Sequence, residues 1–244
     1  MNATAANMRD VAYEYLKGKI LNCEILPGQE ISEKRVLDAL GTGRTPVREA
    51  IITLQKEGLV EVFPRKGTCA TTITIADATE LYQLRKLIEP TVAIQFREQL
   101  DPGKLMKFDE SFLEICDRIG NDSDIEFYEL DIKFHSYIVE SANNSRLKRI
   151  FDDIMLSVYR LGIFNTIQNQ HNPKQSTYNQ HHRIIQAILM EDDDEIQKAL
   201  VSHINYSRMS SLKTLSTVQN TSERKSAEKN HDHLSNDDHD YNRL

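Results

Sequence analysis

Apolar side chains recur at helical spacing over almost the whole stretch from about residue 76 to 212, which contains only three prolines. Such a long helical pattern predicts an all-α bundle for residues 76–212. Beyond Leu212 the sequence becomes polar and loses its apolar periodicity, so residues 213–244 are predicted to be a disordered polar tail. The chain of 244 residues is long enough for two modest domains or one large one.

Residues 8–75 follow a different pattern, namely three short helices and then two β-rich runs. Ser32 is a suitable N-cap for a helix over Glu33–Leu40, which Gly41 ends. We expect Thr45 to cap the next helix with Pro46 at its first position, where a missing N–H costs nothing. The fold class is therefore mainly α, with an N-terminal helix-turn-helix and a C-terminal helical bundle.

The helix after Thr45 has two distinct sides. Its core-facing stripe consists of residues at i, i+4 and i+7: Val47, Ile51 and Leu54. Arg48 lies off this stripe, and Arg44 and Thr45 lie at the open N-terminal end, where basic side chains could reach guanine edges or phosphates. The runs 59–63 and 68–73 predict a small β-hairpin, the wing of a winged helix-turn-helix.

Charge and cysteine content restrict the class of protein. The net charge is −7, but residues 1–75 hold ten Lys/Arg against nine Asp/Glu, a balance of about +1 that is compatible with DNA. The three cysteines, Cys23, Cys69 and Cys116, form neither a disulfide framework nor a metal knuckle. No run reaches the roughly 18 apolar residues that a membrane span needs. We expect a cytoplasmic protein without a membrane partner.

The stretch PGQEISEKRVLDALGTGRTPVREAIITLQKEGLVEVFPRKGT resembles the winged-helix head of GntR-type bacterial transcription regulators, above all in RTPVREA and EGLV. The resemblance covers about fifty residues and implies binding to double-stranded operator DNA. The DNA contacts that it implies fall on Lys34, Arg44, Thr45 and Arg48, with Lys66 and Gly67 in the wing. Lys34 stands where arginine is commoner in the family, which replaces a forked donor by a point charge.

Four possible metal ligands lie on apolar stripes of the second region. Asp131 and His135 are four residues apart and so point the same way from one helix. His181 aligns with a better isoleucine stripe than His182 does, and His203 lies in line with apolar residues of a later helix. Each histidine alone is more often a satisfied core residue, and Asp131 could simply pair with His135. Together the four make an N/O set that suits Zn, Ni, Mn or Fe(II).

This arrangement resembles the all-helical effector domain of the FadR subfamily, the FCD domain, over roughly residues 76–212. The resemblance implies a homodimer, a metal at Asp131, His135, His181 and His203, and a small organic acid beside it. Arg85 is a candidate to meet the acid's carboxylate, although it could equally pair with Glu89 one turn later, and Arg160 is a second candidate.

The leading hypothesis is a ligand-responsive repressor that binds a palindromic operator as a dimer and is released by the acid. Two alternatives remain open from the sequence. One is a metal-dependent hydrolase that uses the Asp/His set to activate water. Against it, helical spacing places no glutamate or other base near these ligands. The other is a pure metal sensor, in which the ion itself is the signal.

Overall fold

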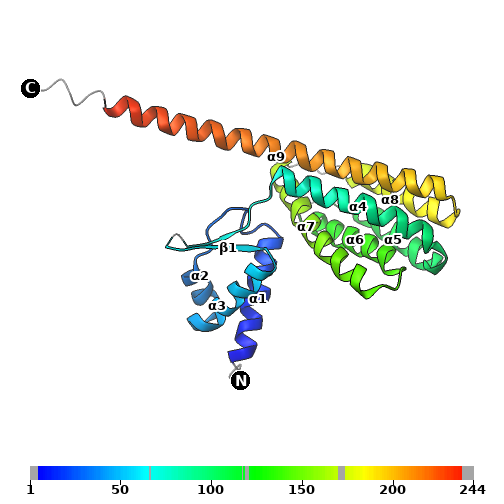
Figure 1. Cartoon of the computed structure of the whole chain (residues 1–244), viewed down its shortest axis with the longest axis horizontal. Coiled ribbons are helices and arrows are strands. Elements are labelled where there is room, and N and C mark those ends of the chain that lie inside the picture. Colours follow the sequence, from blue (N-terminus) through cyan, green and yellow to red (C-terminus); the bar gives the residue numbers. More distant parts are fainter. Residues whose placement is uncertain (1–4, 66, 117, 119–120, 170–173, 238–244) are drawn as a thin grey trace, which may run out of the picture.

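The computed structural model describes residues 5–65, 67–116, 118, 121–169 and 174–237. Figure 1 shows a small head of three helices and a hairpin beside a bundle of longer helices, which we call the body. The elements of the head are α1 Ala5–Leu21, α2 Glu33–Leu40, α3 Arg44–Lys56, β1 Val60–Phe63 and β2 Gly67–Ala70. The elements of the body are α4 Ile75–Gln95, η1 Arg97–Gln99, α5 Pro102–Cys116, α6 Asn121–Glu140, α7 Ser145–Asn169, α8 Lys174–Leu189 and α9 Asp193–Asp237.

The helices of the head begin and end largely where local chemistry dictates. The hydroxyl of Ser32 accepts a hydrogen bond from the Arg35 backbone N–H at 3.4 Å, and Gly41 ends α2 in the left-handed conformation with φ 60°. The predicted stripe of α3 is buried against α1, so the head has its own apolar core. This core comprises Ala12, Leu16, Ile20, Ile31, Val36, Val47, Ala50, Ile51, Leu54, Leu59, Val60 and Ala70.

The start of α3 differs from the prediction. The helix begins at Arg44 with Gly43 as its N-cap, and no side chain caps it, so Thr45 is not the cap. Pro46 is consequently the third helical residue rather than the first. The physical reason is that the first four N–H groups of any helix lack an internal partner, so proline is tolerated at several early positions.

The wing is an antiparallel pair in which Val60 lies opposite Ala70 and Phe63 lies opposite Gly67. Its turn needs left-handed backbone at Arg65 (φ 66°) and at Gly67 (φ 106°). The predicted DNA contact Lys66 lies outside the described residues. The loop before α2 hydrogen-bonds to β2 through Ile31 N and Thr68 O at 2.7 Å, which ties the wing to the head.

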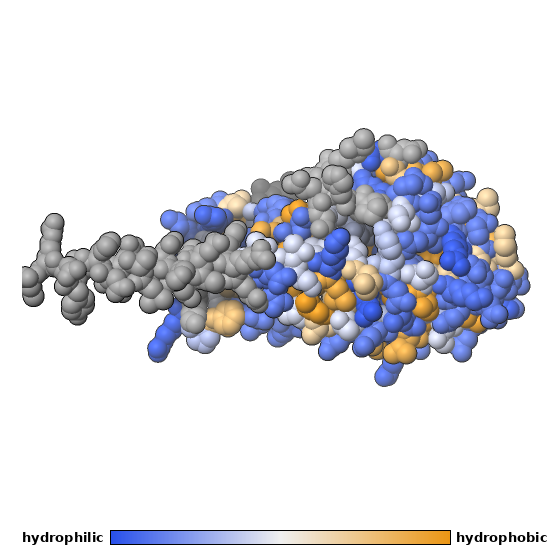
Figure 2. Space-filling view, turned by 90° about the horizontal axis from the view of Figure 1, so that it is seen from above, coloured by the Kyte–Doolittle hydropathy of each residue, from blue (hydrophilic) through white to orange (hydrophobic). Residues whose placement is uncertain are grey.

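The body buries a core between α4, α5, α6, α8 and α9, in which aromatic and isoleucine side chains dominate. Phe112, Phe127 and Phe134 pack edge to face or tilted, with ring centroids 5.4 to 5.8 Å apart. Figure 2 shows a mainly hydrophilic surface with scattered apolar residues, as is usual for a folded domain. Within the described part of the chain, none of the helices has the length and hydrophobicity that crossing a bilayer requires.

The C-terminal part departs from the prediction of a disordered tail. Helix α9 continues beyond Leu212 to Asp237, and Figure 1 shows it extending past the body. As far as residue 218 the reason is a sparse apolar stripe at a spacing of three: Leu215 is buried, and Leu212 and Val218 pack against the same cluster. The prediction that regular structure ends at residue 212 is therefore wrong, and residues 238–244 lie outside the described residues.

Candidate functional site

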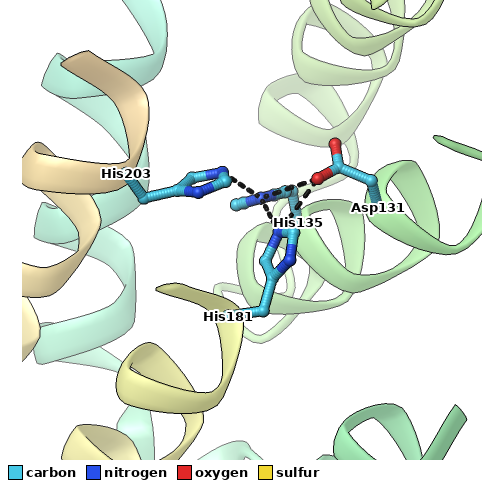
Figure 3. Close-up of side chains that lie close together, drawn as sticks. All are labelled: Asp131, His135, His181 and His203. Atoms are coloured by element: carbon cyan, nitrogen blue, oxygen red, sulfur yellow. Dashed lines mark hydrogen bonds and ion pairs between the residues drawn. The ribbon is translucent and has the colours of Figure 1, made fainter. Parts of the chain in front are cut away.

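The four predicted ligands come together from three helices. Asp131 and His135 lie one turn apart on α6, while α8 contributes His181 and α9 contributes His203. Figure 3 shows their polar atoms pointing toward a common centre. All four residues are buried, and one ligand atom from each lies within 4.8 Å of the others.

The spacing of these atoms suits a metal ion. His181 Nε2 lies 2.9 Å from Asp131 Oδ1, and His135 Nε2 lies 3.2 Å from His203 Nε2. His135 Nε2 also lies 3.3 Å from His181 Nε2 and 3.7 Å from Asp131 Oδ1. With bonds of about 2.0–2.1 Å to the ion, neighbouring ligand atoms lie about 2.9 Å apart at octahedral angles and about 3.3 Å apart at tetrahedral angles. The residues present therefore fit a divalent ion without large movement.

Packing holds the imidazole rings in this orientation. His181 stacks on Phe112 with ring centroids 4.2 Å apart and an interplanar angle of 7°, and His135 stacks on His203 at 5.0 Å. The neighbouring His182 instead lies partly exposed, where Nδ1 is 2.8 Å from Asp109 Oδ2. Of the two adjacent histidines, the inward one is thus His181.

Glu89 on α4 supports the cluster from behind His135, a role that the sequence did not predict. Glu89 is fully buried, and its Oε2 lies 2.6 Å from His135 Nδ1. A carboxylate on Nδ1 directs Nε2 toward the cluster, as in many carboxylate–histidine–metal sites. Its other oxygen, Oε1, is 2.5 Å from Arg85 Nε, so the predicted alternative pairing of these two residues is present. The signal that could have found Glu89 is its place on the buried face of α4, one turn from Arg85.

Burial and the neighbouring charges shift the pKa values of the carboxylates and imidazoles in the cluster. Burial alone would raise the pKa of Asp131, but His135, His181 and Arg85 hold the pKa well below its ordinary value. Burial would likewise raise the pKa of Glu89, and Arg85 and His135 bring it below the usual range. Burial lowers the pKa of His181 and, with the neighbouring imidazoles, lowers that of His203 strongly. Anionic Asp131 and Glu89 together with neutral His181 and His203 are the states that a cation requires.

A cavity of about 50 Å³ lies beside Asp131. Its wall is rich in hydroxyl and amide groups: Tyr82, Arg85, Phe127, Tyr128, Asp131, Val158, Gly162, Asn165, Thr177, Tyr206, Ser207, Ser210 and Ser211. Among the described residues, Asn165 Oδ1 is buried there without a hydrogen-bond partner. Arg85 is only 1% exposed and lines this cavity while it pairs with Glu89.

Arg160 does not lie at this cavity. Its Nη1 donates to Thr71 Oγ1 at 2.8 Å and its Nη2 donates to the Thr71 carbonyl at 2.7 Å. It projects from a different face of α7, toward the head. The prediction that Arg160 meets an acid beside the ligand cluster is therefore wrong.

The described α2 and α3 residues predicted to contact DNA lie on the surface of the head. Lys34, Arg44, Thr45 and Arg48 are all exposed, the last three in the first turns of α3. Arg48 Nε lies 3.4 Å from Glu33 Oε2. Because Gly43 provides no side-chain cap, the free N–H groups at the start of α3 remain available to an anion. Exposed Gly67 lies in the wing beside exposed Arg65, a basic residue that was not among the predicted contacts.

Comparisons with known proteins agree with these two parts. Residues 8–69 match the bacterial regulatory proteins of the gntR family, and residues 80–206 match the FCD domain. The chain is 26% identical over 195 residues to YdhC, an HTH-type transcriptional regulator of Bacillus subtilis strain 168, which covers 80% of this chain and 86% of YdhC. It is also 26% identical over 192 residues to RspR, an HTH-type transcriptional repressor of Escherichia coli K12, covering 79% and 83% of the two chains.

The fold is found in solved structures as well. A GntR transcriptional regulator from Rhodococcus sp. RHA1 superposes with a TM-score of 0.67 at 20% identity, over 84% of this chain and 97% of that one. The matched families are DNA-binding transcription regulators and not enzymes, so the hydrolase hypothesis is excluded. The chain therefore belongs to the GntR family of bacterial transcription regulators, in which it joins a winged helix-turn-helix to an FadR-type FCD domain.

Proposed function

We propose that this regulator is a repressor that binds a palindromic operator as a homodimer in the cytoplasm and releases it when a small organic acid binds at a metal site. The observation that carries the proposal is the convergence of Asp131 and three imidazoles beside a cavity lined by Arg85. Under this proposal, residues 8–75 bind DNA, and residues 76–212 bind the effector and form the dimer.

The head would present α3 to the major groove with its N-terminus first. Arg44 and Arg48 have the forked donors that read guanine, while Thr45 and Lys34 suit phosphate oxygens. Gly67 and Lys66 would bring the wing close to the neighbouring minor groove. Two copies related by a two-fold axis would double these contacts and match the symmetry of a palindrome.

In the body, Asp131, His135, His181 and His203 would hold a Zn, Ni, Mn or Fe(II) ion, with Glu89 fixing the tautomer of His135. The bound ion would supply a Lewis-acidic centre with room for a carboxylate oxygen. The cavity of about 50 Å³ would have to widen to admit a small acid, and Arg85 on its wall offers a cationic partner. The acid must bind the released state more tightly than the DNA-bound state, because a ligand with equal affinity for both shifts nothing.

Two measurements on the purified full-length chain test this proposal. Elemental analysis is expected to give one divalent ion per chain, and a thermal-shift screen of small organic acids should give hits that vanish after chelation. Acid hits that survive chelation would contradict the metal-anchored effector site. Operator affinity that follows the metal concentration without any acid would favour the pure metal sensor instead.

A further inference from the structure

The head meets the body through α7, at a set of contacts that we call the junction: Asn22, Cys23, Thr71, Tyr159 and Arg160. Tyr159 Oη donates to Asn22 Oδ1 at 2.6 Å, and Cys23 Sγ donates to the Arg160 carbonyl at 3.6 Å. The Arg160 guanidinium donates twice to Thr71, once to the hydroxyl and once to the carbonyl. Residues 71–74 link β2 to α4, and we call them the linker. Arg160 therefore binds the first residue of the linker between the wing and the body.

These contacts are partly shielded from solvent, because Asn22 and Thr71 are half-buried while their partners on α7 are buried. Arg160 is 4% exposed and Cys23 is also 4% exposed, and Cys23 packs in one apolar cluster with Tyr159, Leu161 and Ile163. No carboxylate pairs with the Arg160 guanidinium among the described residues, so Thr71 is its main partner. Hydrogen bonds from a charged donor are roughly twice as strong as neutral ones, and their loss would leave a buried cation unsatisfied.

The opposite side of the same helix lines the cavity beside Asp131. Val158, Gly162 and Asn165, at i, i+4 and i+7, share that face of α7. A Cβ at Gly162 would lie 2.7 Å from Tyr128 Cδ1, so α7 and α6 approach closely here and α7 cannot move toward α6. A molecule that fills the cavity would contact this face of α7 and press on the helix directly.

We propose that Arg160 is a positioning residue that couples the cavity to the DNA-binding head: by holding Thr71, it makes the wing and linker follow α7 when the cavity is filled. This inference rests on the proposed effector site and adds the route by which it controls the head. Helix α7 would be the moving element, with one face toward the ligand and another toward the junction.

The test uses hydrogen exchange of the full-length chain, read at the linker amides of residues 71–74. In metal-free protein, Arg160→Ala should speed this exchange about tenfold or more, whereas Arg149→Ala, which removes an exposed arginine from the same helix, should leave it unchanged. Arg160→Lys keeps the charge but cannot span both acceptors, so it should also speed the exchange. Equal exchange in the Arg160 and Arg149 variants would refute the proposal.

A second arm measures coupling with acetate as the probe, added at saturating concentration to Zn²⁺-loaded protein. Acetate should change linker exchange in the wild type severalfold, and this response should be lost in Arg160→Ala while circular dichroism and zinc content stay at wild-type values. Linker amides that exchange equally with and without acetate in the wild type would overturn the coupling.

Thr71→Val supplies a milder variant should Arg160→Ala fail to fold. It removes only the hydroxyl acceptor, so severalfold faster linker exchange is expected, and unchanged exchange would again refute the proposal. The metal-free arm requires neither operator nor ion. Its failure thus counts against the junction alone, whereas a chain that binds no DNA counts against the proposed function.

Discussion

Replacing His181 with alanine should remove both packing and metal binding, whereas the same change at the adjacent His182 should do neither. The His181 ring is fully buried, stacks on Phe112 and lies 2.9 Å from Asp131. A large-to-small change at such a site costs about 2–5 kcal/mol of unfolding free energy. The His182 side chain is 45% exposed and pairs with Asp109 near the surface, where an ion pair contributes about 0–1 kcal/mol.

Bound zinc should increase the difference in stability between His181→Ala and His182→Ala. An ion present at a hundred times its dissociation constant adds about 2.7 kcal/mol to the stability of a protein that binds it only when folded. For a chain of this size, that corresponds to a rise of roughly 5–10 °C in Tm. The wild type and His182→Ala should both show this rise, and His181→Ala should show little of it.

The assay is thermal unfolding by circular dichroism, in chelator and in excess Zn²⁺, with elemental analysis of each dialysed protein. His181→Ala should have a lower Tm in chelator and less than one-tenth of the wild-type zinc content. Equal zinc contents and equal zinc-induced Tm shifts in the two variants would show that the ligand set is wrong.

Three further outcomes are expected. Arg48→Ala should abolish specific operator binding in a gel shift without lowering Tm, because Arg48 is exposed and makes no core contact; wild-type affinity would contradict the role of α3. Gly162→Ala should destabilise the chain by about 1–3 kcal/mol in urea unfolding, since its methyl group overlaps the Tyr128 ring; an unchanged midpoint would refute that packing argument. Acidification should destabilise metal-free protein as the pH falls through about 6.5, because the folded pKa of His203 is depressed and the unfolded chain binds the extra proton. Unfolding free energy that stays constant between pH 7.5 and 5.5 would contradict this assignment.

Local chemistry was enough to predict much of the head and the ligand cluster. The cap at Ser32 and the stop at Gly41 depend only on neighbouring backbone groups. Helical spacing alone aligned Asp131 with His135 and separated His181 from His182, because a buried stripe has a fixed period.

The missed features depend on how distant segments meet. Glu89 reaches His135 only because α4 packs against α6, and nothing within α4 specifies that neighbour. Arg160 lies on the face of α7 opposite the cavity, and which face of α7 meets the cavity depends on how α7 packs against α6. Between Leu212 and residue 218, α9 is supported by a few apolar residues such as Leu215, which are too sparse among polar neighbours to form a recognisable pattern in the sequence.

The most direct test of the central claim is a titration of the purified full-length chain against a duplex from its own promoter region, at modest ionic strength, followed by fluorescence anisotropy. We predict saturable binding by two chains per palindrome, at least about a thousandfold tighter than to an unrelated duplex. Addition of an acid identified by the thermal-shift screen should release the duplex from the metal-loaded protein. Equal affinity for promoter and unrelated duplexes, with or without metal and acid, would contradict the account.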